Sequence, residues 1–204
     1  MYSGITRGLF PVVHVEKRSG VTRFDVELSA ALAQGAELGA SIAIDGVCCT
    51  VMALTGQRVG FEAMAETLSL TTLDELSVGR RVSVERSCRV GDELGGHDVF
   101  GHIIGTGRVM AKAFVGEQLD LSIGVPAAWM KYVSAKGFVA LDGSSLTVGE
   151  VRADGFDVHL IPETQRLTNF ANKEVGQRVN VELDPRTVAI VDTVERVLKE
   201  RGLG

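Results

Sequence analysis

The sequence is poor in several residue types, and each shortage argues against a class of protein. Its 204 residues include only three cysteines and four prolines, and 5% of them are aromatic. Three cysteines without framework spacing, two of them adjacent, argue against a disulfide scaffold and predict a reduced, cytoplasmic protein. The few aromatic residues and the lack of a basic run argue against nucleic-acid binding, which needs positive charge or stacking platforms.

The chain also lacks a long hydrophobic run and a cluster of metal ligands. No stretch of about 18 uncharged apolar residues occurs, so no membrane-spanning segment is predicted. Met1–Ile5 has no secretory signal character. Cys48 and Cys49 have no second cysteine pair, and the four histidines are scattered, so no metal site is expected. The net charge is −5, and 45% hydrophobic residues are enough to fill cores.

What the sequence does contain is a second copy of itself. Asp45-Gly46 in the first half and Asp142-Gly143 in the second half lie 97 positions apart. The same spacing, without a gap, joins Gly4 with Gly101, Gly8 with Gly105, Thr50 with Thr147, Glu66-Thr67 with Glu163-Thr164, and Gly79 with Gly176. This self-similarity predicts two copies of one small domain. We place them at residues 1–93 and 94–185, with residues 186–204 outside the repeat.

Each copy is predicted to form a small antiparallel β-barrel from short strands separated by glycine turns. Alternating or β-branched segments indicate strands at 12–15, 22–28, 41–54, 58–64 and 81–86 in the first copy and at 120–123, 137–151, 156–161 and 178–183 in the second. Asp45-Gly46 and Asp142-Gly143 interrupt two of these segments and mark tight turns. Acid catalysis is the alternative role for the two aspartates.

The connecting segments are expected to be short and irregular. Residues 30–33 predict a short helical turn, and residues 127–132 take the equivalent place in the second copy. Residues 69–75 are polar and predict a turn. The glycine-rich residues 88–95 predict the hinge between the copies.

The tail predicts a helix that has no counterpart in the first copy. Asp184-Pro185 is a favourable helix start, because Asp caps free N–H groups and Pro is tolerated at the first position. An apolar stripe follows on one helical face, formed by Ile190, Val191, Val194, Val197 and Leu198. A helix this short is marginal alone in water, so the stripe must be covered. It packs either on its own barrel or in a bundle of such helices from several chains.

Several motifs, in order, resemble the riboflavin synthase family of the α-chain type. The matching segments are Asp45–Val51, Gly95-Gly96-His97, Gly101-His102-Ile103, Lys136–Val148, Leu160–Thr164 and Val191–Leu198. The resemblance runs from residue 1 to about 200 and includes the duplication. It implies a mainly β protein with two similar six-stranded antiparallel Greek-key β-barrels plus a C-terminal α-helix. It also favours assembly of three chains through that helix.

The resemblance implies an activity as well. Family members take two molecules of 6,7-dimethyl-8-ribityllumazine and move a four-carbon unit from one to the other, without a cofactor or metal. The products are riboflavin and 5-amino-6-ribitylaminouracil. A duplicated domain supplies two related pockets for two copies of one substrate, and the site is expected between barrels of neighbouring chains. The alternative is a non-catalytic lumazine- or flavin-binding protein of the antenna type.

Candidate site residues follow from the family motifs at matching positions. In the first copy, substrate contacts are expected from Gly4, Ile5, Thr6, Ser41, Cys48, Cys49, Thr50, Glu62, Ala63, Met64, Ala65, Glu66 and Thr67. In the second copy, they are expected from Gly101, His102, Ile103, Lys136, Ser145, Leu146, Thr147, Leu160, Ile161, Pro162, Glu163, Thr164 and Gln165.

Four of these residues are candidates for catalysis. His102 is expected to transfer a proton, because imidazole titrates near neutral pH. Cys48 and Ser145 are candidates for addition to the substrate ring or for placing a nucleophilic water, and Thr147 is a further candidate. Two equal substrates need unequal roles, so positions where the copies differ are the most informative: Cys48 matches Ser145, and Ile5 matches His102.

The remaining expectations concern departures from the family and neighbouring residues. Tyr2 stands where Phe is usual, and Asp45 where Asn is usual. Phe100 stands where a small Ser is common, so its ring either reshapes the approach to His102 or fills a gap. His97 is interpreted as a structural residue of the linker. Asp184 could touch the site as well as cap the helix, and Lys136 is hypothesised to pair with a carboxylate.

Overall fold

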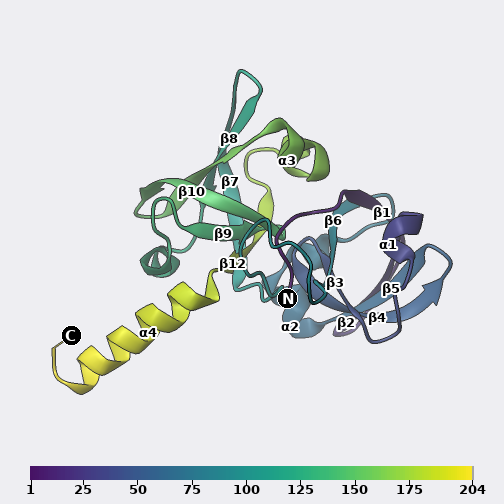
Figure 1. Ribbon diagram of the computed structural model, residues 1–204, viewed down its shortest axis with the longest axis horizontal. Coiled ribbons are helices and arrows are strands. Elements are labelled where there is room, and N and C mark those ends of the chain that lie inside the picture. The colour runs from purple at the N-terminus through teal and green to yellow at the C-terminus, as the bar shows by residue number, and fades with distance from the viewer. Residues whose placement is uncertain (204) are drawn as a thin grey trace.

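In the computed structural model, which describes residues 1–203, each half of the chain forms a closed barrel of six antiparallel strands (Figure 1). The first barrel contains β1 (Leu9–Arg18), β2 (Val21–Glu27), β3 (Ser41–Ile44), β4 (Val47–Thr55), β5 (Arg58–Met64) and β6 (Arg81–Arg86). The second contains β7 (Gly105–Val115), β8 (Gln118–Gly124), β9 (Phe138–Leu141), β10 (Ser144–Arg152), β11 (Gly155–Leu160) and β12 (Arg178–Leu183). The predicted fold class is confirmed.

The two barrels share one topology. The strands of the first close in the order β1-β2-β5-β4-β3-β6, and those of the second in the corresponding order β7-β8-β11-β10-β9-β12. Corresponding strands begin within one residue of the 97-residue spacing. The internal repeat of the sequence is therefore a repeat of structure as well.

Each barrel has its own core, and strand alternation decides which side chains enter it. On β4, Val47, Cys49 and Val51 are buried in the first core, whereas Cys48 and Thr50 are exposed on the outer face. The second core is filled in the same way, by residues that include Phe156, Leu160 and Phe170. Because successive strand residues point to opposite faces, every second residue of β4 and β10 is available for other contacts.

Two tight turns meet where the barrels touch. Asp45-Gly46 joins β3 to β4, and Asp142-Gly143 joins β9 to β10. All four residues have positive φ, as a type I′ hairpin turn requires. A Cβ added to Gly46 would lie 2.3 Å from the Gly143 nitrogen, so the turns pack backbone to backbone. The interpretation of the two aspartates as turn residues is confirmed.

Short helices connect the strands. They are α1 (Ala30–Ala33), α2 (Ala65–Leu70), η1 (Thr72–Glu75), η2 (Ala127–Tyr132), α3 (Pro162–Leu167) and η3 (Phe170–Asn172). The prediction of a turn at 69–75 is wrong, because these residues are divided between two short helices. The Thr71 hydroxyl donates to the Thr67 carbonyl at 2.7 Å and accepts from the Leu73 N–H, while Leu73 is fully buried.

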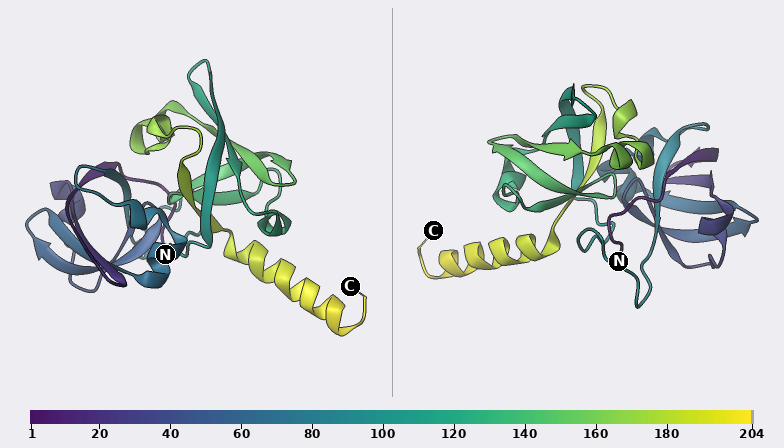
Figure 2. Two further views of the ribbon diagram at one scale, coloured as in Figure 1. Left: turned by 180° about the vertical axis from the view of Figure 1, so that it is seen from behind. Right: turned by 45° about the horizontal axis from the view of Figure 1, so that its top comes forward.

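Helix α4 (Pro185–Glu200) begins at the predicted cap and points away from both barrels (Figures 1 and 2). The Asp184 carboxylate accepts from the Arg186 and Thr187 N–H groups, both at 3.2 Å. Ile190 is 65% exposed and Val194 is 51% exposed. The stripe is therefore not covered by its own barrel, and the alternative of packing there is wrong. None of the helices described is long and apolar enough to cross a membrane.

Candidate functional site

The segment that precedes each barrel lies against the other barrel. Residues 2–6 lead into β1, but the Gly4 carbonyl accepts from the Ser145 N–H of β10 at 2.8 Å. Residues 99–103 lead into β7, but the Gly101 carbonyl accepts from the Cys48 N–H of β4 at 3.1 Å. The segments also pair with one another through a bridge between Tyr2 and Val99. Each copy therefore contributes a segment to the outer face of its twin.

Glycine is required at the points of contact. Gly4 and Gly101 have φ values of +72° and +77°, a region that side chains disfavour. A Cβ added to Gly4 would lie 2.5 Å from the Ser145 Cβ, and one added to Gly101 would lie 2.6 Å from the Cys48 Cβ. The two glycines thus allow the exchanged segments to approach the strands closely.

Two buried glutamates hold the segments in place, and the sequence analysis did not anticipate their role. Glu85 accepts from the Ser3 and Gly4 N–H groups at 2.8 and 3.1 Å. Glu182, its counterpart, accepts from the Phe100 and Gly101 N–H groups at 2.6 and 2.8 Å. Burial raises the pKa of both carboxyl groups. The available signal was the repeat itself, since a Val-Glu pair occurs at the same place in both copies.

The contact on the first barrel borders an open pocket of about 290 Å³, which we call the Cys48 pocket. Its lining residues are Val47, Cys48, Glu66, Thr67, Leu70, Thr71, Gly101, His102 and Ile103. The side chains of Cys48 and His102 are both exposed there and come from different copies. The Phe100 ring lies 6.1 Å from the His102 ring, centroid to centroid, and Phe100 is not among the lining residues.

The equivalent cavity on the second barrel, the Ser145 pocket, has a volume of about 210 Å³. It is lined by Gly4, Ile5, Thr6, Ser144, Ser145, Ile161, Glu163, Thr164, Leu167 and Thr168. The structure corrects the grouping by copy: Gly4–Thr6 belongs with Ser145, and Gly101–Ile103 belongs with Cys48. Sequence spacing does not reveal this exchange, because the 97-residue spacing relates Gly4 to Gly101 and Cys48 to Ser145 whichever segment lies against whichever strand.

His97 has a more specific position than the linker role expected for it. Its Nδ1 lies 2.6 Å from the Ser145 Oγ, and its ring stacks on Phe138 with centroids 5.2 Å apart. Burial lowers the pKa of His97, against the opposing influence of Asp184 and Asp98. A neutral imidazole in this place can accept a hydrogen bond from the Ser145 hydroxyl.

The structure brings about half of the predicted site residues into the two pockets. Those in the linings are Gly4, Ile5, Thr6, Cys48, Glu66, Thr67, Gly101, His102, Ile103, Ser145, Ile161, Glu163 and Thr164. Those outside the linings are Ser41, Cys49, Thr50, Glu62, Ala63, Met64, Ala65, Lys136, Leu146, Thr147, Leu160, Pro162 and Gln165.

Alternation explains four of the thirteen residues outside the linings. The side chains of Cys49, Ala63, Leu146 and Leu160 are buried in the barrel cores, so only their backbone groups could meet a ligand. Thr50 and Thr147 are exposed on the outer faces of their strands, two residues beyond Cys48 and Ser145.

Other polar candidates are engaged elsewhere. Glu62 accepts from Arg23 Nε at 2.7 Å, and Gln165 donates to the Leu160 carbonyl at 2.9 Å. Within residues 1–203, Lys136 forms no ion pair, and its pairing with a carboxylate stays a prediction. In the same range, no group of three His, Cys, Asp or Glu side chains is placed to hold a metal ion.

Comparison with known proteins places this architecture in a family. The lumazine binding domain model matches residues 3–87 and again residues 100–184. Riboflavin synthase from Escherichia coli (strain K12) is 45% identical over 204 residues, covering 98% of this chain and 95% of that protein. The chain belongs to the riboflavin synthase family.

A second riboflavin synthase also matches along nearly the whole chain. The protein from Buchnera aphidicola subsp. Baizongia pistaciae (strain Bp) is 42% identical over 200 residues, covering 98% of this chain and 94% of its own. Among solved structures, LumP complexed with riboflavin superimposes with a TM-score of 0.84 at 24% identity, covering 90% of this chain and 100% of LumP. LumP complexed with 6,7-dimethyl-8-(1'-D-ribityl) lumazine gives 0.82 at 23%. These two structures show that the two-barrel fold is shared beyond the riboflavin synthase family's close members.

Proposed function

We propose that this chain is a riboflavin synthase, which converts two molecules of 6,7-dimethyl-8-ribityllumazine into riboflavin and 5-amino-6-(D-ribitylamino)uracil by transfer of a four-carbon unit. The observation that carries the proposal is the matched pair of pockets. Each has the same elements at the same spacing, and each is completed by the twin copy's segment. Two equivalent pockets suit a reaction whose two substrates are the same molecule.

The differences between the pockets suit unequal roles. The Cys48 pocket offers a thiol and an imidazole, from Cys48 and His102, and the Ser145 pocket offers a hydroxyl with His97 behind it. The reaction begins with loss of a proton from the C7 methyl of one lumazine and needs an addition to the ring of the other. We assign proton transfer to His102. Cys48 and Ser145, with Thr147 nearby, are assigned to the addition.

The complete site is proposed to form between chains of a homotrimer. The two pockets of one chain share no lining residue, so each holds its own lumazine. Two lumazines meet face to face when the first barrel of one chain adjoins the second barrel of the next. The uncovered apolar stripe of α4 supports assembly through this helix. Holding the two rings in register then removes the entropic cost of a bimolecular encounter.

Two further assignments accompany this proposal. We place the protein in the cytoplasm, since the Cys48 thiol has to stay reduced and cytoplasmic thiols do. We also propose residues 1–93, 94–185 and 186–204 as the first lumazine-binding domain, the second lumazine-binding domain and the trimerisation helix.

The decisive experiment needs only the purified protein and the lumazine. Incubated together with a chelator and nothing else, they are expected to produce the absorbance of riboflavin. Binding that changes lumazine fluorescence without producing riboflavin would contradict the proposal and favour the antenna type of protein. Boiled protein is the control for the slow uncatalysed reaction.

A further inference from the structure

Tyr2 is a buried phenol with an unusual partner. Its side chain is fully buried in the small apolar cluster between the barrels, together with Ala43, Val99 and Ala140. Its hydroxyl donates a hydrogen bond to the Cys48 Sγ at 3.2 Å. Within residues 1–203, this sulfur is the hydroxyl's sole hydrogen-bond partner.

Packing alone does not require this hydroxyl. The ring fills the cluster, and a phenylalanine ring would fill it equally. Burying a hydroxyl is unfavourable unless the group is hydrogen-bonded. The bond to Cys48 therefore offsets the burial, and Tyr2 links the interior of the molecule to a side chain of the Cys48 pocket.

The direction of this bond decides its effect on the thiol. Burial raises the pKa of Tyr2 far above its usual range, so the phenol keeps its proton and remains a donor. A donor stabilises a thiolate more than a thiol, and the thiolate is the nucleophile. The other titratable groups near this contact are His102 from segment 99–103, Glu66 from α2, Glu85 from β6 and the adjacent Cys49. The charges of Glu66 and Glu85 disfavour a thiolate, whereas the hydroxyl of Tyr2 favours it.

We propose that Tyr2 is a positioning residue for Cys48: its hydroxyl holds the sulfur in one rotamer and makes it a better nucleophile than an unpartnered thiol. The same short segment reaches the second pocket, because the Gly4 carbonyl binds the Ser145 N–H. One short stretch, residues 2–4, thus contacts Cys48 in the first pocket and Ser145 in the second. The kinetic consequence rests on the proposed function, but the effect on the thiol does not.

The test is Tyr2→Phe, made in a Cys88→Ser background so that Cys48 is the accessible thiol. The rate of alkylation by iodoacetamide is measured from pH 6 to 10, and the modified residue is identified by peptide fragmentation. Loss of the donor is expected to move the midpoint upward by about half a pH unit, which slows alkylation roughly threefold below the midpoint. Tyr132→Phe, whose hydroxyl binds Asp192 instead, is the matched control and is expected to change nothing.

Turnover is measured on the same proteins. Tyr2→Phe is expected to lower kcat and leave KM for the lumazine unchanged, because it alters the reactivity of Cys48 and not the shape of the pocket. An alkylation profile identical to that of the parent overturns the inference, whatever the turnover. If Tyr2→Phe shifts the alkylation profile but the parent protein makes no riboflavin, the role of Tyr2 is supported and the proposed function is contradicted instead.

A second measurement does not depend on reactivity. Cys48→Ala leaves the Tyr2 hydroxyl buried without a partner, so the Tm is expected to fall. Adding Tyr2→Phe to that variant removes the stranded hydroxyl and is expected to raise the Tm again. A further fall on adding Tyr2→Phe would show that the hydroxyl is stabilised by something other than Cys48, and would overturn the inference.

Discussion

His102 shows how one residue can make two equal pockets unequal. It lines the Cys48 pocket, while its counterpart in the repeat, Ile5, lines the Ser145 pocket. An imidazole can take and return a proton, and an isoleucine cannot. The duplication therefore supplies two similar pockets, and this single difference places an imidazole in the lining of only one of them.

We expect His102→Gln to lower kcat by about 100-fold, the lower range for loss of a general acid–base group, while lumazine still binds. Glutamine keeps a polar side chain at the same place but does not titrate. Turnover is followed by riboflavin absorbance and binding by lumazine fluorescence. His159→Gln is the matched control, since this exposed histidine pairs with Asp120 outside both pocket linings. Unchanged turnover in His102→Gln would remove His102 from the mechanism.

His97 and Ser145 form the second prediction at this scale. His97→Phe keeps a ring to stack on Phe138 but removes the Nδ1 that contacts the Ser145 hydroxyl. If the two act as a unit, His97→Phe and Ser145→Ala lower kcat by similar factors and the double variant is no worse than either alone. Steady-state kinetics of the three variants measure this. Fully additive losses would show that His97 acts independently of Ser145.

At the scale of elements, the sequence predicted the strands well and the site only in part. Local sequence patterns located eleven of the twelve strands apart from their ends but missed β7, and the Asp-Gly pairs located two turns, because both signals are local. The exchange of segments 2–6 and 99–103 is not local. It depends on Glu85 and Glu182 binding backbone N–H groups more than 80 residues away, and neither alternation nor spacing encodes such a contact. The partnership of His97 with Ser145 was missed for the same reason.

Because segment 99–103 lines only the Cys48 pocket, we expect Gly101→Ala to damage that pocket and to leave the Ser145 pocket intact. Alanine at positive φ costs about 1 kcal/mol wherever it occurs, but here its Cβ would also collide with β4 at Cys48. Displacement of the segment is expected to remove lumazine binding from the Cys48 pocket and to halve the stoichiometry per chain in a fluorescence titration. Gly116→Ala is the control, because it has φ +62° and no atom within 4 Å of the added Cβ. Full stoichiometry in Gly101→Ala would contradict the prediction.

The prediction for α4 concerns assembly. Val194→Glu places a charge in the exposed apolar stripe, so the proposed trimer is expected to dissociate into monomers in light scattering. Each chain is still expected to bind lumazine, because each pocket lies within one chain. Turnover is expected to be lost, because the proposed complete site needs pockets from two neighbouring chains. Arg196→Glu, on the opposite helical face, is expected to remain trimeric and active. A monomer of Val194→Glu that still makes riboflavin would contradict a site shared between chains.

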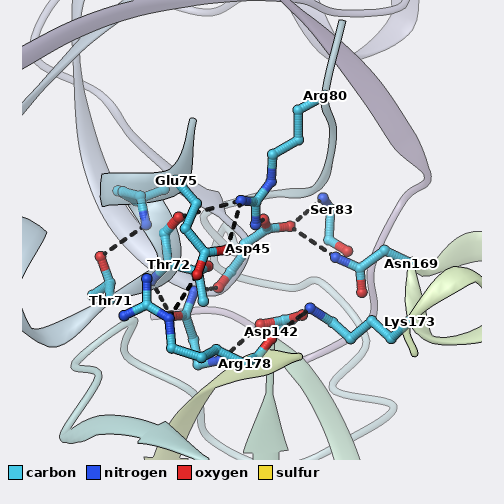
Figure 3. A network of polar contacts seen from close by, with 12 residues as sticks. Asp45, Thr71, Thr72, Glu75, Arg80, Ser83, Asp142, Asn169, Lys173 and Arg178 are labelled. Atoms are coloured by element: carbon cyan, nitrogen blue, oxygen red, sulfur yellow. Dashed lines mark hydrogen bonds and ion pairs between the residues drawn. The ribbon is translucent and has the colours of Figure 1, made fainter. Parts of the chain in front are cut away.

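At the scale of the whole molecule, the barrels are joined by a buried charged network (Figure 3). The Asp45 carboxylate accepts from the Ser83 N–H at 2.7 Å and lies 3.2 Å from Arg80 Nη2. Asp142 lies 3.0 Å from Lys173 Nζ and accepts from the N–H of Asn180 at 2.8 Å. The two aspartates belong to the facing turns of the two copies, so the interface carries two buried carboxyl groups close to each other.

The pKa of Asp45 makes this interface sensitive to pH. Burial, the largest cause, and the nearby Asp142 raise the pKa of Asp45 to about 6, against the opposing influence of Arg80 and Lys173. Because this folded-state pKa is above the unfolded value near 4, the protonated group favours the folded state. That contribution is complete below about pH 4 and is lost as the pH rises through about 6.

Asp45→Asn is therefore expected to stabilise the protein at neutral pH relative to acid pH. Asparagine keeps an acceptor for the Ser83 N–H but carries no proton to lose. The difference in unfolding free energy between variant and parent should grow by on the order of 3 kcal/mol between pH 4 and pH 8, the equivalent of a shift of about two units. Thermal unfolding at several pH values measures it. Asp25→Asn, which removes a carboxylate from a partly exposed pair with Arg58, is the control. A difference independent of pH would mean that Asp45 is ionised equally in both states, and that Arg80 and Lys173 fully offset its burial.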